Sequence, residues 1–455
     1  MPITWSLAEA AAALGGRLVN GADTLARPLE GAVVDHREVT PGCLFVALPG
    51  RNTHGRHFAA AAIAAGAAVV LLDGEAPAGV PAWVVDDAGR TLVALGRHML
   101  ERTQVAVAAV TGSVGKTSAK LLMEAVLGQR WAAQASPRSF NTEIGLPLAV
   151  LGLEASTRWF VAEMGMRSPG EIRRLCRWAP PHVAAITNIG MAHIGRLGSQ
   201  EAILHAKAEI LENLGADDWA VLNRADPWLR RLQPTGHHVL WYGEEGADLW
   251  AEDIGEEDGA VRFTLVGPGF REPVRLPWDG RHQVMNGLAA AGVGLAAGLT
   301  PAEAAAGLAA IDPDAGHFRR LQGRSLTILD DTFNASPDSM RAGLSVLVRA
   351  PGRRVAVLGD MLELGDFEEA AHRGIGGDAA LAADILVTVG ERARWIAEAS
   401  GLAPDRVYAA GDADEARLWL HRHLQRGDTV YAKASRAVGL NHLVKDLMTW
   451  DIASY

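Results

Sequence analysis

The segment VAVAAVTGSVGKTS, residues 105–118, is the most informative part of this chain. An apolar, β-branched run leads into a glycine-containing turn, and the spacing of apolar residues after Lys116 is typical of a helix. Gly112 and Gly115 allow the backbone to fold tightly around phosphate oxygens, and the first turn of the helix offers unpaired N–H groups to the same anion. Lys116 can neutralise the outer phosphates and Thr117 can ligate magnesium. The segment therefore predicts a P-loop and nucleotide chemistry.

This loop is shorter than the common pattern GxxxxGK[ST], because Val110 stands where the first glycine of that pattern would be. The alternative interpretation is a Gly/Ser turn with a chance lysine, and the strand before it and the helix after it argue against that. We expect Ser113, Val114 and Ser118 to contact the nucleotide as well. Nucleotide binding by itself leaves transporters, GTPases and kinases open.

Helical and β-branched segments alternate on both sides of this loop, which predicts βαβ units and an α/β fold. Because 455 residues exceed the size of a single hydrophobic core, we expect two or three domains, and changes of pattern along the chain divide it into three blocks. The expected domains are a small α/β domain over 1–84, a central P-loop ATPase-type domain with a mostly parallel sheet over 85–312, and a C-terminal Rossmann-like domain over 313–455.

Individual elements can be predicted from apolar runs and their periodicity. In the first block we expect strands at 31–36, 43–49 and 67–73 and a helix around 57–66. Residues 85–104 are expected to be helical, and 237–277 to form short strands and turns. The strands expected in the third block lie at 325–331, 353–360, 384–390, 406–410 and 428–435.

Bulk properties limit the function classes. The formal net charge of -10 argues against a general nucleic-acid binder, although a local basic pocket for one anionic nucleotide remains compatible with it. Two cysteines, Cys43 and Cys176, are too few for a disulfide framework. The N-terminus lacks the features of a signal peptide, and no apolar run is long enough to span a bilayer. We expect a cytoplasmic monomer with small-molecule partners and no membrane insertion.

The shortened TGxxGKT loop resembles that of the Mur ligase and folylpolyglutamate synthetase superfamily, and the rest of the chain carries further segments that resemble this family in its order. They are FNTEIGLPLAVL (140–151), EMGMRSPGEI (163–172), TNIGMAHIGRLGSQEAILHAKAEI (187–210), GRHQVMNGLAA (280–290), HFRR (317–320), LDDTFNASPDSM (329–340), VLGDMLELG (357–365) and KASR (433–436). The resemblance implies ATP and Mg²⁺ as cofactors and amide-bond formation through an acyl phosphate.

Within the family, DDTFNASPDSM together with LGDMLELG most resembles the members that join D-alanyl-D-alanine to UDP-N-acetylmuramoyl-tripeptide, so the resemblance implies these two substrates. The DNPR motif of the members that add the third residue is not visible. Two alternatives stay open: a related ligase with another amino-acid acceptor, and a non-catalytic nucleotide-binding protein on the same fold. The third residue of the tripeptide, meso-diaminopimelate or lysine, is left open.

The resemblance also implies a metal site made by Thr117, Glu163, His193 and Lys207, with Lys207 carbamylated. Glu163 follows an apolar run, at the strand end where open α/β sheets place ligand-binding groups. The alternatives are a solvated strand-end acid, a surface histidine and a lysine on the surface of a helix. By the same resemblance the catalytic residues are Lys116, Lys207, His193 and Arg319.

The other implied contacts involve ATP and the two substrates. Arg319 would reach the γ-phosphate when the domains close, and Asn286, Asp331 and Asn334 would also contact ATP; buried hydrogen bonding at a strand end is the alternative for Asp331 and Asn334. The residues expected to contact the substrates are Arg37, Arg51, Asn52, Thr53, Asn141, Thr142, Ser435 and Arg436. The chain departs from common family residues at His36, Thr142, Phe333, Ser336 and Ala434.

Overall fold

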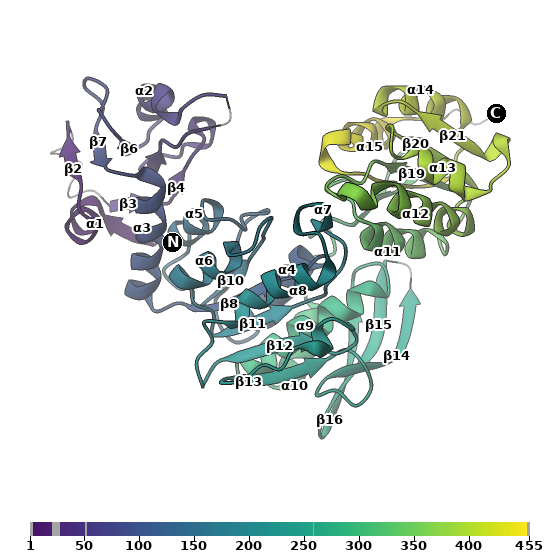
Figure 1. Ribbon diagram of the computed structural model, residues 1–455, viewed down its shortest axis with the longest axis horizontal. Helices are drawn as coiled ribbons and strands as arrows, with labels where there is room; N and C mark the ends of the chain where they lie inside the picture. Colours follow the sequence, from purple (N-terminus) through teal and green to yellow (C-terminus); the bar gives the residue numbers. More distant parts are fainter. Residues whose placement is uncertain (1–2, 21–27, 51, 258, 453–455) are drawn as a thin grey trace.

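The computed structural model describes residues 3–20, 28–50, 52–257 and 259–452. Three α/β bodies follow one another along the chain, with the first and the last at opposite ends of the long axis and the central body between them (Figure 1). In these ranges no helix combines the length and the apolarity needed to cross a membrane.

The N-terminal body is built on a five-stranded sheet of order β2-β7-β6-β5-β4, in which β2 is antiparallel to β7 and the other pairs are parallel. Its strands are β2 (Arg17–Val19), β4 (Ala32–Val33), β5 (Leu44–Val46), β6 (Val69–Asp73) and β7 (Ala82–Val85). A separate pair, β1 (Thr4–Ser6) with β3 (Pro28–Glu30), lies beside helix α1 (Leu7–Leu14), whereas helix α2 (Ala59–Ala64) packs on β6.

The strand predicted over 31–36 is wrong in its second half. The strand β4 ends at Val33, and a 3₁₀ turn, η2 (His36–Glu38), follows it. The carboxylate of Asp35 accepts a hydrogen bond from the backbone N–H of Arg37, and this cap favours the turn over an extended chain. The periodicity of apolar residues does not register such a local side-chain bond.

The central body contains a six-stranded parallel sheet of order β13-β12-β11-β8-β10-β9. Its strands are β8 (Ala106–Thr111), β9 (Ala133–Ala135), β10 (Trp159–Glu163), β11 (Val183–Ile186), β12 (Trp219–Asn223) and β13 (His238–Tyr242). The helices of this body are α3 (Ala88–Thr103), α4 (Lys116–Leu127), α5 (Gly145–Leu151), α6 (Glu171–Trp178), α7 (Ile194–Leu197), α8 (Gln200–Ala208), α9 (His282–Ala296) and α10 (Pro301–Ala309).

Both faces of this sheet are covered, which explains why its strands read as continuous apolar runs. The helices α4 and α9 pack on one face, and α10 packs against these two helices. An antiparallel sheet of β14 (Trp250–Glu257), β15 (Ala260–Gly267) and β16 (Phe270–Leu276) packs against α9 and α10. The helices α3, α5, α6 and α8 pack on the other face. Because the neighbouring strands β11, β8 and β10 are parallel, their carboxyl ends lie at the same edge of the sheet.

The C-terminal body has a six-stranded sheet of order β17-β18-β22-β19-β20-β21, parallel except for the antiparallel edge strand β17. Its strands are β17 (Arg319–Gln322), β18 (Thr327–Asp330), β19 (Arg354–Gly359), β20 (Ile385–Val389), β21 (Val407–Ala410) and β22 (Thr429–Lys433). Its helices are α11 (Pro337–Leu347), α12 (Glu368–Ala382), α13 (Arg394–Ser400), α14 (Ala413–His423) and α15 (Leu440–Thr449).

The predicted α/β class with a mostly parallel central sheet and a Rossmann-like C-terminal sheet is confirmed. All five strands predicted for the third block are present, and β17 is an additional one. The expected boundary after residue 84 falls one residue before the end of β7, and the boundary after 312 falls between α10 and β17.

Candidate active site

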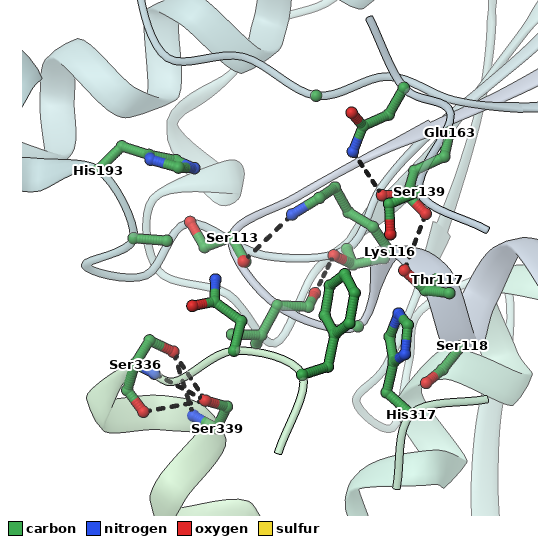
Figure 2. A pocket seen from close by; sticks show the side chains of 18 of the residues that line it. Ser113, Lys116, Thr117, Ser118, Ser139, Glu163, His193, His317, Ser336 and Ser339 are labelled. Atoms are coloured by element: carbon green, nitrogen blue, oxygen red, sulfur yellow. Dashed lines mark hydrogen bonds between the residues drawn. The ribbon is translucent and has the colours of Figure 1, made fainter. Parts of the chain in front are cut away.

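A cavity of about 1490 Å³ lies where the carboxyl ends of the central strands face the C-terminal body. The central body contributes the loop residues 113–118 together with Glu163, His193 and Lys207. The C-terminal body contributes the segment 333–336 and neighbouring residues. Figure 2 shows side chains of both bodies facing one another across this space.

The phosphate loop follows β8, and two of its positions require glycine. Gly115 has φ +81°, and a Cβ there would overlap the amide of Asn286; a Cβ at Gly112 would overlap the hydroxyl of Thr187. Asn188 clamps the loop, because its amide accepts from the N–H of Val114 (3.0 Å) and donates to the carbonyl of the same residue (3.0 Å). Sequence reasoning did not single out Thr187 or Asn188, although their place directly after β11 was a usable signal.

Hydrogen-bond donors converge on this loop. The Lys116 ammonium donates to the carbonyls of Gly112 (2.8 Å) and Ser113 (3.3 Å), and burial lowers its pKa while the Glu163 carboxylate opposes the shift. The buried hydroxyls of Ser113 and Ser139 line the cavity and have no hydrogen-bond partner among the described residues. Unpaired buried hydroxyls beside an ammonium suit phosphate oxygens as ligands.

Glu163, the last residue of β10, is the centre of a buried polar cluster and is only 2% exposed. Its carboxylate accepts from the Thr117 hydroxyl (2.8 Å) and the Asn141 amide (2.9 Å), and the Lys120 ammonium lies 3.7 Å away. This burial excludes a solvated strand-end acid. Sequence reasoning missed Lys120, which is 1% exposed; the signal was its place one helical turn after Lys116, among apolar residues.

Lys207, near the end of α8, is buried as well, which excludes a lysine on a helix surface. It is 2% exposed, and its ammonium donates to the Gly112 carbonyl (2.9 Å). Burial, and then the nearby Lys116 cation, lower the pKa of Lys207 well below its usual value. A lysine with a strongly lowered pKa is available as the neutral amine, which is the form that carbon dioxide can carbamylate.

His193 lies directly before α7 in a left-handed backbone conformation, φ +66°. Its Nδ1 is 2.7 Å from a carboxylate oxygen of Glu363, a residue of the C-terminal body that sequence reasoning did not single out. Burial and the Lys116 cation lower the pKa of His193, and the Glu363 carboxylate acts in the opposite direction. The imidazole is partly buried and lines the cavity, so it is not a free surface histidine.

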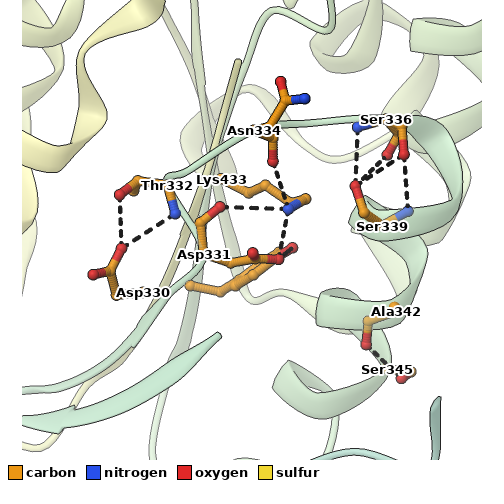
Figure 3. A network of polar contacts seen from close by, with 10 residues as sticks. Asp330, Asp331, Thr332, Asn334, Ser336, Ser339, Ala342, Ser345 and Lys433 are labelled. Carbon is orange, nitrogen blue, oxygen red and sulfur yellow. Dashed lines mark hydrogen bonds and ion pairs between the residues drawn. The ribbon is translucent and has the colours of Figure 1, made fainter. Parts of the chain in front are cut away.

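In the C-terminal body, Asp331 and Asn334 line the cavity around a buried lysine. The Lys433 ammonium, 2% exposed, is 2.6 Å from the Asp331 carboxylate and donates to the Asn334 carbonyl at 2.8 Å (Figure 3). Burial raises the pKa of Asp331, and the Lys433 cation counteracts the rise. The carboxylate of Asp331 is therefore engaged in hydrogen bonding at a strand end, and the residue also lines the cavity.

The predicted Arg319 is not among the residues that line the cavity. Its guanidinium pairs with Asp330 across the β17–β18 ladder at 2.7 Å. The rings of His317 and Phe333, which do line the cavity, stack on each other with their centroids 3.8 Å apart. The predicted contact of Arg319 with a γ-phosphate therefore requires a movement of the C-terminal body.

The other predicted residues divide into two groups. Those that line the cavity, besides the ones already described, are Val114, Ser118, Asn141, Thr142, Asn286, Ser435 and Arg436. The residues Arg37, Asn52 and Thr53 lie on exposed turns of the N-terminal body and do not line it. Arg37 pairs with Asp35 at 2.6 Å. Arg51 lies outside the described residues, and the predicted uridine contacts stay predictions.

Models of three protein domains match this chain. The Mur ligase middle domain matches residues 110–294, the glutamate ligase domain of Mur ligases matches 317–436, and the catalytic domain of the Mur ligase family matches 30–101.

Relatives match over nearly the whole chain. The UDP-N-acetylmuramoyl-tripeptide--D-alanyl-D-alanine ligase of Mycobacterium tuberculosis is 36% identical and covers 99% of this chain and 98% of its own length. The ligase of the same name from Bacillus subtilis is 34% identical, with 93% and 96% covered.

Among solved structures, MurF from Acinetobacter baumannii superposes with a TM-score of 0.88 at 29% identity, covering 98% of this chain and 99% of that one. MurF from Thermotoga maritima in complex with ADP gives a TM-score of 0.80 at 29% identity, covering 92% and 97%.

Proposed function

The chain belongs to the Mur ligase family, and from this premise we propose that it joins D-alanyl-D-alanine to UDP-N-acetylmuramoyl-tripeptide while ATP is cleaved to ADP and phosphate. The observation that carries the proposal is that the buried side chains of Glu163 and Lys207 and the half-buried Lys116 line one cavity, in a chain similar to such ligases over nearly its whole length. The product is a UDP-N-acetylmuramoyl-pentapeptide, a precursor of peptidoglycan.

The reaction that this site supports is activation of a carboxylate. An oxygen of the tripeptide's terminal carboxylate attacks the γ-phosphorus of ATP, the bond to the ADP oxygen breaks, and an acyl phosphate forms. The amine of D-alanyl-D-alanine then attacks the acyl carbon, phosphate leaves, and the nitrogen loses a proton as the amide forms. No covalent bond to the protein is needed.

The roles proposed for the loop follow from its donors. Lys116 and the N–H groups at the start of α4 would neutralise charge on the transferring phosphoryl group, and they lie in a partly buried site where such interactions are strong. The hydroxyls of Ser113 and Ser139 would add hydrogen bonds. Asn286, at the rim of Gly115, is the proposed contact to the rest of the nucleotide, together with Asp331 and Asn334.

Magnesium fits the donors of this cavity under one condition. Within the described ranges, His, Cys, Asp and Glu side chains alone form no group of three that could hold a metal. The proposed ligands Thr117, Glu163 and His193 therefore need a further anionic oxygen donor, which a carbamate on the buried amine of Lys207 would supply. When bound, magnesium neutralises phosphate charge.

The C-terminal body is the proposed site of the amine substrate. Ser435 and Arg436 line the cavity directly after β22, where a carboxylate of the dipeptide could be bound by charge and hydrogen bond. Arg319 would leave Asp330 and turn toward the γ-phosphate when the C-terminal body closes on the central one, and closure of this kind excludes water from the acyl phosphate.

The N-terminal body is the proposed binding site of the UDP moiety, with Arg37, Arg51, Asn52 and Thr53 as its contacts. We further propose a monomer in the cytoplasm, because ATP is a substrate and one chain supplies both walls of the cavity.

The test is product identification by mass spectrometry. The protein is incubated with UDP-N-acetylmuramoyl-tripeptide, D-alanyl-D-alanine, ATP and Mg²⁺, and the expected product has the mass of the two substrates less one water. A Lys116→Ala variant is the control, with a rate expected to be lower by about 10³-fold or more. Absence of the pentapeptide with the unaltered protein, while ATP and the tripeptide bind, would refute this function.

A further inference from the structure

The central and C-terminal bodies meet in a contact between two turns, one around Gly195 and the other around Gly365. The backbone N–H of Gly195 donates to the Glu363 carbonyl at 3.2 Å. A Cβ on Gly195 would lie 2.5 Å from the Gly365 nitrogen, and a Cβ on Gly365 would lie 2.8 Å from the Gly195 Cα. Backbone therefore packs on backbone, and only glycine fits at either position.

Two side chains face each other at this contact, and both are held in an uncommon backbone conformation. His193 and Glu363 each have φ +66°, and they are two of the six described non-glycine residues with positive φ. Left-handed backbone is disfavoured for such residues and persists where the surrounding structure imposes it, often at functional sites. Its occurrence at both ends of one 2.7 Å contact indicates that the two turns are built to present these side chains to each other.

The carboxylate of Glu363 determines which tautomer of the His193 imidazole is present. A carboxylate can only accept a hydrogen bond, so the Nδ1 of His193 must carry the proton that Glu363 accepts. The neutral ring then keeps its lone pair on Nε2, which is the form in which histidine binds a metal. Figure 2 shows the His193 side chain extending toward the part of the cavity that holds Ser113 and Lys116.

We propose that Glu363, carried by the C-terminal body, is a positioning residue for the magnesium site, because it fixes the tautomer and the orientation of His193 in the central body. Carboxylates that accept from the second nitrogen of a metal-bound histidine act in this way in other proteins. The position of the C-terminal body at the Gly195–Gly365 contact thereby controls the affinity for the metal. This inference rests on the proposed function for the identity of the metal only.

The first experiment observes His193 directly, without nucleotide or metal. The full chain is labelled with ¹⁵N-histidine, and long-range ¹H–¹⁵N spectra distinguish the two neutral tautomers; the signal that a His193→Gln variant lacks identifies the residue. We expect the proton of His193 on Nδ1 in the unaltered protein and a shift toward Nε2 in Glu363→Ala. Arg196→Ala is the matched control, because Arg196 touches the other oxygen of Glu363 at 3.6 Å and leaves the histidine contact in place.

The second experiment measures the Mg²⁺ concentration that half-activates phosphate release. We expect it to rise 10- to 100-fold in Glu363→Ala, and less in Glu363→Gln, whose amide oxygen still accepts a hydrogen bond. An Asp366→Ala variant, which removes an exposed carboxylate from the same turn, should match the unaltered protein. The glutamine variant replaces the alanine variant in both experiments if the latter does not fold.

A His193 ring with its proton on Nε2 in the unaltered protein would overturn the proposal. So would a Glu363→Ala protein in which the tautomer and the Mg²⁺ requirement both stay unchanged. If the unaltered protein releases no phosphate with the two substrates, the proposed function fails, and the spectra of His193 still decide whether Glu363 sets its tautomer.

Discussion

Replacement of Glu163 by Gln tests the physical basis of the buried cluster. The substitution keeps the size of the side chain and removes its charge. The Thr117 hydroxyl can still donate to the new amide oxygen, and the Asn141 amide can turn to accept from the new amide nitrogen. What is lost is the anion beside Lys120, whose own side chain is 1% exposed.

The expected loss of stability follows from one distance. At 3.7 Å and an effective dielectric constant of about 20, the attraction between the two charges is about 4–5 kcal/mol. Removal of one partner of a buried ion pair costs about 3–5 kcal/mol. Lys120 keeps hydrogen bonds to the carbonyls of Ser136 (2.7 Å) and Arg138 (2.6 Å), so we expect the lower end, about 3 kcal/mol.

Hydrogen exchange followed by mass spectrometry reads this loss in peptides from α4 and β10, separately from the other two bodies. A loss of about 3 kcal/mol makes exchange roughly 100-fold faster. The control is a double-mutant cycle with Lys120→Met. Because the double variant contains no unpaired buried charge, it should be about 2–3 kcal/mol more stable than the sum of the single effects. Additivity within about 0.5 kcal/mol would refute the account of this cluster.

Lys207, the phosphate loop and two buried histidines can each be tested by substitution. Lys207→Ala should abolish turnover, and short carboxylates added to the medium should restore part of it; no rescue, or a bare ammonium at this position in a high-resolution map, would contradict the carbamate. Gly115→Ala should weaken ADP binding at least about 10-fold in calorimetry, because the Cβ of the new alanine would overlap Asn286 at the phosphate loop. Gly198→Ala is the control and should bind ADP normally, because Gly198 has the same φ of +81° but open space around it. Burial lowers the pKa of His282 and of His317 to about 4 in the folded protein, below the unfolded value near 6.5. The contribution of these two histidines to stability is therefore complete above pH 6.5 and is lost as the pH falls toward 4. The melting temperature should decrease over this interval, and an equal decrease in a variant with glutamine at both positions would contradict the assignment.

The parts of the site that lie next to each other in the sequence could be predicted without a structure. The loop around Gly112 and Gly115 combines a strand, a glycine turn and a helix start within a few residues, so local pattern and chemistry agree. The place of Glu163 at the cavity was predictable because this residue ends an apolar run, and its role as a metal ligand stays a prediction. The roles of His193 and Lys207 came from the family resemblance, since a single histidine or lysine in a helix or loop carries no local signal.

Other features depend on contacts between distant segments. The burial of Lys120 is decided by β10 and by the loop after β9, which the sequence of α4 does not contain. The contact of Glu363 with His193 joins residues 170 positions apart and exists only where two bodies meet. The pairing of Arg319 with Asp330 depends on the antiparallel strand β17, which was not predicted.

The choice of amine substrate tests most directly whether this chain joins D-alanyl-D-alanine to the tripeptide. Phosphate release from ATP is measured with UDP-N-acetylmuramoyl-tripeptide and, in turn, D-alanyl-D-alanine, L-lysine, meso-diaminopimelate and D-glutamate. We predict release with D-alanyl-D-alanine and none above background with the others, because a site arranged for the dipeptide would leave polar groups unpaired with a wrong amine. Rapid release with UDP-N-acetylmuramoyl-dipeptide and a diamino acid, in place of this result, would identify the chain as the ligase that adds the third residue and would contradict the account.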